Sequence, residues 1–273
     1  MARTISMVRL AGGLRLPCAI QGAGGIPLLL LHGYTDSWRS FAPLLDHLPG
    51  HLRAIAPTQR GHGEADRPAH GYRPEDFAGD VRHLLDALAI DRAVIAGHSM
   101  GSNVALRFAI DHPDRTAGLA LLGAYTTLRG NPVIEELWAA DVEPLRDPVD
   151  PAFARAFQES TLAQPVPAAF LDTVVAESLK VPARVWRDTL AACRDCDFTA
   201  EIATVRAPTL ILWGARDAIM PEAQQRTLAR LIPDARLLIY PDAGHGLHWE
   251  EPERAARDLA CFVAAPGAMP CAG

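Results

Sequence analysis

The sequence lacks any long uninterrupted apolar segment. Its N-terminal residues, MARTISMVRLAGGLRL, carry arginines but not the apolar stretch that a secretory signal needs. The longest apolar run near the start, residues 26–31 (IPLLLL), is much shorter than the roughly 20 residues of a membrane-spanning helix. These absences predict a cytoplasmic protein that has no membrane partner.

Positive charge is also scarce. The 273 residues include 26 Lys and Arg against 32 Asp and Glu, and the formal net charge at pH 7 is −6. Lys180 is the only lysine, and no basic cluster is dense enough to bind phosphate groups or anionic lipid. We therefore expect no nucleic-acid partner.

Metal-binding patterns are poorly represented. Cys193 and Cys196 form a C-x-x-C pair, but neither a second ligand pair nor a thioredoxin-like strand–helix context accompanies it. We interpret the pair as two thiols on one helix face and expect no metal site.

The sequence does contain alternating strand-like and helix-like segments. With 49% hydrophobic residues, the chain can bury a sizeable core. The alternation favours an α/β fold with a mostly parallel sheet that is covered by helices on both faces. Strands are expected within residues 26–33, 52–63, 92–99, 116–124, 207–217 and 235–245, and helices within 74–90, 103–113 and 252–264.

One region interrupts this alternation. Residues from about 126 to 203 are helical in pattern, are punctuated by prolines and contain no credible strand. We interpret them as a cap over the carboxyl edge of the sheet. The expected organisation is a first core part over residues 1–125, a helical cap over 126–203, a second core part over 204–264, and a disordered tail over 265–273.

A serine lies between two glycines where a strand gives way to a helix. Residues 97–101 read GHSMG, after the apolar stretch AVIA and before SNVALRFAI. Such a strand–turn–helix segment is tight, and it lifts the serine hydroxyl clear of the sheet. Ser99 is therefore the candidate nucleophile, although an ordinary helix-capping serine has the same local pattern.

A serine nucleophile needs a base, and His245 has the best setting. It is flanked by two glycines in a loop (DAGHGLHW) that follows a strand and precedes the last helix. His248, three residues later, is the alternative. The base in turn needs a carboxylate that orients it. Asp217 follows the end of a buried strand (LILWGARD), whereas the alternative Asp242 has the pattern of a turn former.

The negative charge that develops on the substrate oxygen also needs hydrogen-bond donors. His32 and Gly33 follow the first buried strand, where glycine lets the chain turn beneath the nucleophile. The backbone N–H groups of Tyr34 and Met100 are therefore the expected oxyanion-hole donors.

With these residues the chain resembles the α/β-hydrolase superfamily over roughly residues 20 to 264. The resemblance is carried by the His-Gly turn, GHSMG, WGARD and GHGLHWEEP, and by the order Ser, Asp, His along the chain. The segment PTQRGHGEADRP also resembles a family motif, but Thr58 and Glu64 replace its usual Asp and Ser. That motif is mainly structural, so the two departures matter little for the chemistry.

The resemblance implies a serine hydrolase, closest to the carboxylesterase and enol-lactonase group. It implies an acyl-enzyme, no metal and no organic cofactor, a small-molecule ester or lactone as partner, and a monomer or homo-oligomer. The serine nucleophile argues against dehalogenases and epoxide hydrolases of this superfamily, which use aspartate. Carbon–carbon bond hydrolases of ring-cleavage products, cofactor-free haloperoxidases and a non-enzymatic ligand-binding role remain open alternatives.

A small to medium, largely apolar substrate is expected. The best candidates for its contacts are Tyr34, Tyr125, Ile219 and Leu247, since each follows a strand end or neighbours a loop that carries a candidate catalytic residue. In the cap the aromatic residues have the helical spacing of core positions, and two arginines could meet a carboxylate but are expected to be solvated. The cap residues considered are Trp138, Phe153, Phe157, Phe170, Trp186, Arg184 and Arg187; Trp38, after the oxyanion turn, is ambiguous between packing and pocket.

Overall fold

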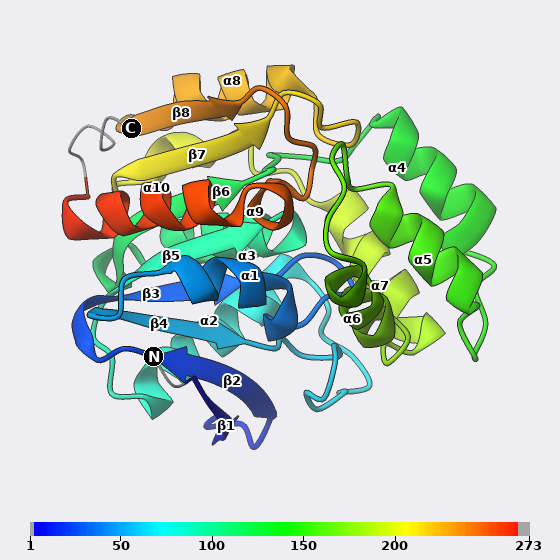
Figure 1. Ribbon diagram of the computed structural model, residues 1–273, viewed down its shortest axis with the longest axis horizontal. Helices are drawn as coiled ribbons and strands as arrows, with labels where there is room; N and C mark the ends of the chain where they lie inside the picture. The colour runs from blue at the N-terminus through cyan, green and yellow to red at the C-terminus, as the bar shows by residue number, and fades with distance from the viewer. Residues whose placement is uncertain (1–2, 267–273) are drawn as a thin grey trace.

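The computed structural model describes residues 3–266 and is built around an eight-stranded sheet (Figure 1). The strands run in the spatial order β1-β2-β4-β3-β5-β6-β7-β8. β1–β2 and β2–β4 are antiparallel, and all other neighbouring pairs are parallel. The strands are β1 (Thr4–Arg9), β2 (Arg15–Gln21), β3 (Gly24–Leu31), β4 (Leu52–Pro57), β5 (Ala93–His98), β6 (Thr116–Leu122), β7 (Thr209–Gly214) and β8 (Ala235–Tyr240).

Helices cover both faces of the sheet, as the alternating sequence pattern predicts (Figure 1). One face carries α1 (Ala42–His47), α9 (Leu247–Glu250) and α10 (Pro252–Ala264), and α1 packs directly on α10. The opposite face carries α2 (Pro74–Ala87), α3 (Met100–Asp111) and α8 (Glu222–Leu231).

The central strands are buried on both faces, so their side chains alternate between two hydrophobic cores. In β3, Leu29 and Leu31 pack with α2 and α3, whereas Leu28 and Leu30 pack with α1 and α10. This double burial explains why these strands read as continuous apolar runs in the sequence rather than as alternating ones.

Four helices lie between β6 and β7 in the chain and beside the carboxyl ends of the parallel strands (Figure 1). Asn131 and Asp150 cap α4 and α5 with their side chains, and a proline opens each of these two helices. The helices are α4 (Pro132–Leu137), α5 (Pro151–Glu159), α6 (Ala168–Ser178) and α7 (Ala183–Asp195); a π-helical turn, η3 (Trp138–Val142), follows α4.

The structure also contains elements that the sequence pattern did not predict. The β1–β2 hairpin extends the sheet at one edge, α1 follows a 3₁₀ turn, η1 (Trp38–Phe41), and α8 connects β7 to β8. Two further 3₁₀ turns are η2 (Pro113–Arg115) and η4 (Ile202–Thr204). Among residues 3–266, no helix has the length and hydrophobicity that crossing a bilayer would take.

The C-x-x-C pair and the C-terminal residues were both interpreted from the sequence. Cys193 lies on α7 and Cys196 follows its last turn, and both thiols are free. Of the predicted disordered tail, residues 267–273 lie outside the described residues.

Candidate active site

Ser99 occupies a sharp turn between β5 and α3, with φ of 52° and ψ of −118°. A positive φ is costly for a residue with a side chain, and such strain concentrates at functional sites. The turn depends on glycine at position 101, because a Cβ atom there would lie 2.1 Å from the carbonyl oxygen of Leu31. The close approach of α3 to β3 therefore fixes Ser99, which is partly buried, at the end of the strand.

His245 and Asp217 form a buried pair. The Nδ1 atom of His245 lies 2.8 Å from Oδ2 of Asp217, and both side chains are almost fully buried. The other carboxylate oxygen, Oδ1, accepts hydrogen bonds from the backbone N–H groups of Ile219 and Met220, each at 2.8 Å. Burial would raise the pKa of Asp217, but His245 and these N–H groups hold it below its ordinary value, so the carboxylate stays ionised.

Gly123 and Glu250, which were not predicted from the sequence, help to position His245. Gly123, at the end of β6, has φ of +53°, and a Cβ atom there would lie 2.9 Å from Nδ1 of His245. Glu250 accepts hydrogen bonds at 3.0 Å from the N–H groups of Gly244 and Ala163, which ties the His245 loop to the segment after α5. For Gly123, the only signal in the sequence was a glycine near the end of a predicted strand.

The two alternative residues have different surroundings. His248 is fully buried, neither of its ring nitrogens has a hydrogen-bond partner in the described structure, and it is not among the residues that line the cavity above Ser99. Asp242 is exposed and pairs with Arg216 at 2.6 Å. The geometry therefore favours His245 and Asp217 over both alternatives.

The turn after β3 places Tyr34 at the cavity wall. Asp36 N donates to the carbonyl oxygen of Gly33 at 3.3 Å, and Thr35 adopts φ of 65°. Met100 is the first residue of α3, so its N–H group has no acceptor within the helix. Tyr34 and Met100 both line the cavity with Ser99, as an oxyanion hole would require.

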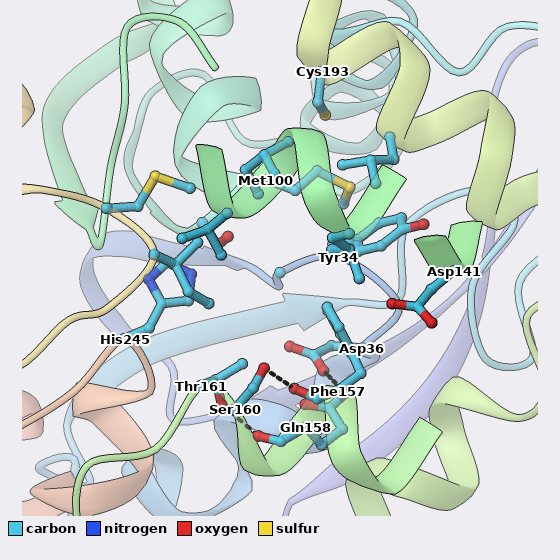
Figure 2. Close-up of a pocket in the computed structure, with 18 of the residues that line it drawn as sticks. Tyr34, Asp36, Met100, Asp141, Phe157, Gln158, Ser160, Thr161, Cys193 and His245 are labelled. Atoms are coloured by element: carbon cyan, nitrogen blue, oxygen red, sulfur yellow. Dashed lines mark hydrogen bonds between the residues drawn. The ribbon is translucent and has the colours of Figure 1, made fainter. Parts of the chain in front are cut away.

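A cavity of about 540 Å³ lies between the edge of the sheet and the helices that connect β6 to β7, and Tyr34, Met100 and His245 border it (Figure 2). That volume suits a small to medium-sized ligand. His245 and Ser99 both line it, and most of its wall is apolar. The apolar residues in the wall include Tyr34, Met100, Tyr125, Leu128, Val133, Ile134, Leu137, Phe153, Phe157, Leu190, Ile219, Met220 and Trp249.

Three of the four predicted substrate contacts, Tyr34, Tyr125 and Ile219, line this cavity. Leu247 does not, because the short helix α9 turns it into the core beside α1 and α10, where it is fully buried. Trp249, two residues further, lines the cavity instead. Of the other side chains considered, Phe153 and Phe157 line the cavity, whereas Trp38, Trp138, Phe170, Arg184, Trp186 and Arg187 do not.

The charged side chains of the cavity wall are acidic. Asp36 lies within it and is 2% exposed, whereas Asp141 in η3 and Asp150 at the start of α5 are exposed. Among the described residues that line the cavity, none is lysine or arginine. Arg184 and Arg187 instead donate to backbone carbonyl oxygens outside it.

The histidines around Ser99 are buried. The His98 ring contacts those of His245 and His248 at tilted angles, with ring centroids 4.8 and 4.4 Å apart. Burial lowers the pKa of His98 to about 3, and burial also lowers that of His248. Both rings are therefore neutral near pH 7 and add no positive charge to the site.

Comparison with known proteins extends this picture. The family model for the alpha/beta hydrolase fold matches residues 26–252. The chain is 30% identical to a 2-hydroxy-6-oxo-2,4-heptadienoate hydrolase of Pseudomonas putida, over 96% of this chain and 97% of that protein. Its structure resembles an esterase from Exiguobacterium antarcticum, with a TM-score of 0.86, 24% identity and coverage of 95% of this chain and 99% of that one.

A second solved structure has the same fold. The enol-lactonase from Burkholderia xenovorans LB400 superposes with a TM-score of 0.79 at 22% identity, over 95% of this chain and all of that one (100%). Identities this low show a shared fold rather than a shared substrate. The family model, which spans most of the chain, shows that this protein belongs to the alpha/beta hydrolase family.

Proposed function

We propose that the protein is a serine hydrolase that cleaves a carboxylic ester or lactone of a small to medium-sized, largely apolar substrate. Ser99 is the nucleophile, His245 the general base and Asp217 the carboxylate that orients it. The proposal is supported by the strained serine turn, by the 2.8 Å contact between His245 and Asp217, and by the apolar cavity that Ser99 and His245 share.

In the proposed reaction, Oγ of Ser99 attacks the carbonyl carbon while His245 takes the hydroxyl proton. The N–H groups of Tyr34 and Met100 stabilise the negative charge on the carbonyl oxygen. His245 then gives the proton to the leaving alkoxide, and the acyl-enzyme forms. A water molecule, deprotonated by the same histidine, attacks the acyl group and releases the acid.

The observation that carries the choice of substrate is the absence of lysine and arginine from the described cavity wall. The heptadienoate substrate named for the P. putida relative is a carboxylate. Placing a carboxylate in a largely apolar wall beside Asp36 would be unfavourable, because no cation there compensates its charge. An ester or lactone without a carboxylate has no such cost.

A hydrolysis panel on the purified protein tests this proposal. It contains acyl esters of short, medium and long chain, five- and six-membered lactones, and one ring-cleavage dienoate, each with wild type and Ser99→Ala. We expect turnover of esters or lactones that Ser99→Ala abolishes. Serine-dependent cleavage of the dienoate alone would contradict the proposal and favour a carbon–carbon bond hydrolase.

A further inference from the structure

The buried carboxyl group of Asp36 has no role in the reaction described above. It lies in the cavity wall, where Figure 2 shows it beside Gln158. No ion pair formed by residues 3–266 includes Asp36, whereas the nearby acid Glu177 contacts both Arg39 and Lys180. Burying a carboxyl group without a cation is costly, so its presence in the cavity requires an explanation.

Neighbouring groups hold Asp36 in one orientation. The amide nitrogen of Gln158 donates to Oδ1 of Asp36 at 3.0 Å and to the hydroxyl of Ser178 at 2.8 Å. The Ser178 hydroxyl lies 3.1 Å from that of Thr35, in the same turn as Asp36. A carboxylate accepts about four hydrogen bonds, and this network supplies only part of that number. The group is therefore oriented but not saturated.

The carboxyl group lies next to the predicted oxyanion hole. A Cβ atom built on Gly33 would be 3.1 Å from Oδ2 of Asp36, and the following residue, Tyr34, is an expected oxyanion donor. Asp36 and Ser99 line the same cavity. A substrate whose carbonyl group is held by Tyr34 would bring its nearby substituents within reach of Asp36.

We infer that Asp36 is a specificity-determining residue that binds a protonated amine of the substrate, close to the ester bond. The inference rests on the proposed ester hydrolysis, of which it names the substrate class. An ammonium N–H donates to the carboxylate and neutralises it, and such charge-assisted bonds are stronger than neutral ones. The two other acids of the cavity wall, Asp141 and Asp150, would attract the same cation.

Matched pairs of esters test the inference. Dimethylaminoethyl butyrate and isoamyl butyrate have nearly the same shape and differ in a protonated amine on the alcohol side. Phenyl dimethylaminobutyrate and phenyl isoheptanoate form the equivalent pair on the acyl side. We expect kcat/KM of wild type to favour the amine in at least one pair, by about tenfold or more.

The Asp36→Asn variant keeps the shape and the acceptor for Gln158 but removes the charge. It should lower the amine preference to about twofold or less, because kcat/KM of the amine ester falls several-fold more than that of the neutral ester. A structural role alone would lower both esters together. The inference is wrong if wild type shows no amine preference, or if the preference survives in Asp36→Asn.

The matched control is Asp141→Asn, which removes an exposed acid of the same cavity. Solvent and salt screen that charge, so we expect most of the preference to remain. Equal losses in the two variants would mean that diffuse charge at the rim sets the preference, which would contradict a specific role for Asp36.

The pH dependence gives a readout that needs no variant at position 36. Burial raises the pKa of Asp36 to about 7, with Glu177 adding to the rise and Gln158, His245 and Gly33 opposing it. The dimethylamino group stays protonated below that pH. The amine preference of wild type should therefore fall as the pH drops below about 7. Any effect of pH that changes both esters of a pair alike cancels in the ratio.

Binding separates this inference from the proposed reaction. The Ser99→Ala protein should bind the amine ester more tightly than its neutral counterpart in calorimetry, and adding Asp36→Asn should remove the difference. Absence of all ester turnover would refute the proposed function but leave this comparison in place. Equal binding of the two esters would refute the role of Asp36 whichever reaction the protein catalyses.

Discussion

The Asp36→Asn variant should be more stable than wild type at neutral and alkaline pH. Asp36 is almost fully buried, and burial raises the pKa of its carboxyl group from 3.8 to about 7. In the unfolded chain the group ionises near its ordinary value. The folded state therefore holds a proton that the unfolded state releases, and the stability of the fold decreases as the pH rises between those two values.

The size of this effect follows from the pKa difference. At about 1.36 kcal/mol per pKa unit, a rise of about 3 units costs the folded state up to about 4 kcal/mol above pH 7. At about pH 5, where the folded protein holds Asp36 largely protonated, the cost is about 2 kcal/mol. Asparagine carries no charge and still accepts the hydrogen bond from Gln158, so the variant avoids both costs.

Denaturant unfolding of both proteins at about pH 8 and pH 5 measures the difference. We expect Asp36→Asn to gain free energy of unfolding at both values, with the larger gain at about pH 8. A destabilised variant, or a gain that is larger at about pH 5, would refute the assignment of Asp36 as an uncompensated buried carboxyl group. The comparison needs no substrate.

Two further predictions concern Asp217, which contacts His245, and the buried His248. Asp217→Asn keeps an acceptor for Ile219 and Met220 but loses the carboxylate that orients His245, so kcat should fall by about a thousandfold. A fall below tenfold would contradict the role of Asp217. His248→Leu removes two unpartnered buried nitrogens, so the free energy of unfolding should rise by about 1 kcal/mol with kcat unchanged; lost activity at full stability would contradict a purely packing role for His248.

The candidate catalytic residues could be predicted from the sequence because each lies in a local pattern of strand, turn and glycine residues. Ser99 lies at a strand–turn–helix junction whose glycines and apolar flanks can be identified without any long-range information. Parallel strands bring their carboxyl ends to one edge, so residues that follow different strands, such as Asp217 and His245, were expected near each other. The 2.8 Å contact between them agrees with that expectation.

Features that depend on distant contacts could not be predicted in the same way. The β1–β2 hairpin joins the sheet because β2 pairs with β4. Nothing in the sequence of these two short strands indicates that partner. Leu247 was expected at the cavity because it follows His245, but one turn of helix directs it into the opposite core. Asp36 has the pattern of a solvated loop residue, and Gln158, which buries it, lies 122 positions away.

Mass spectrometry of the protein after reaction with a fluorophosphonate tests the central claim most directly, because this reagent bonds covalently to activated serines. We expect one label per chain, on the peptide that contains Ser99, with no labelling in Ser99→Ala and strongly slowed labelling in His245→Ala. Labelling of a different residue, or equal labelling of wild type and Ser99→Ala, would show that Ser99 is not the nucleophile.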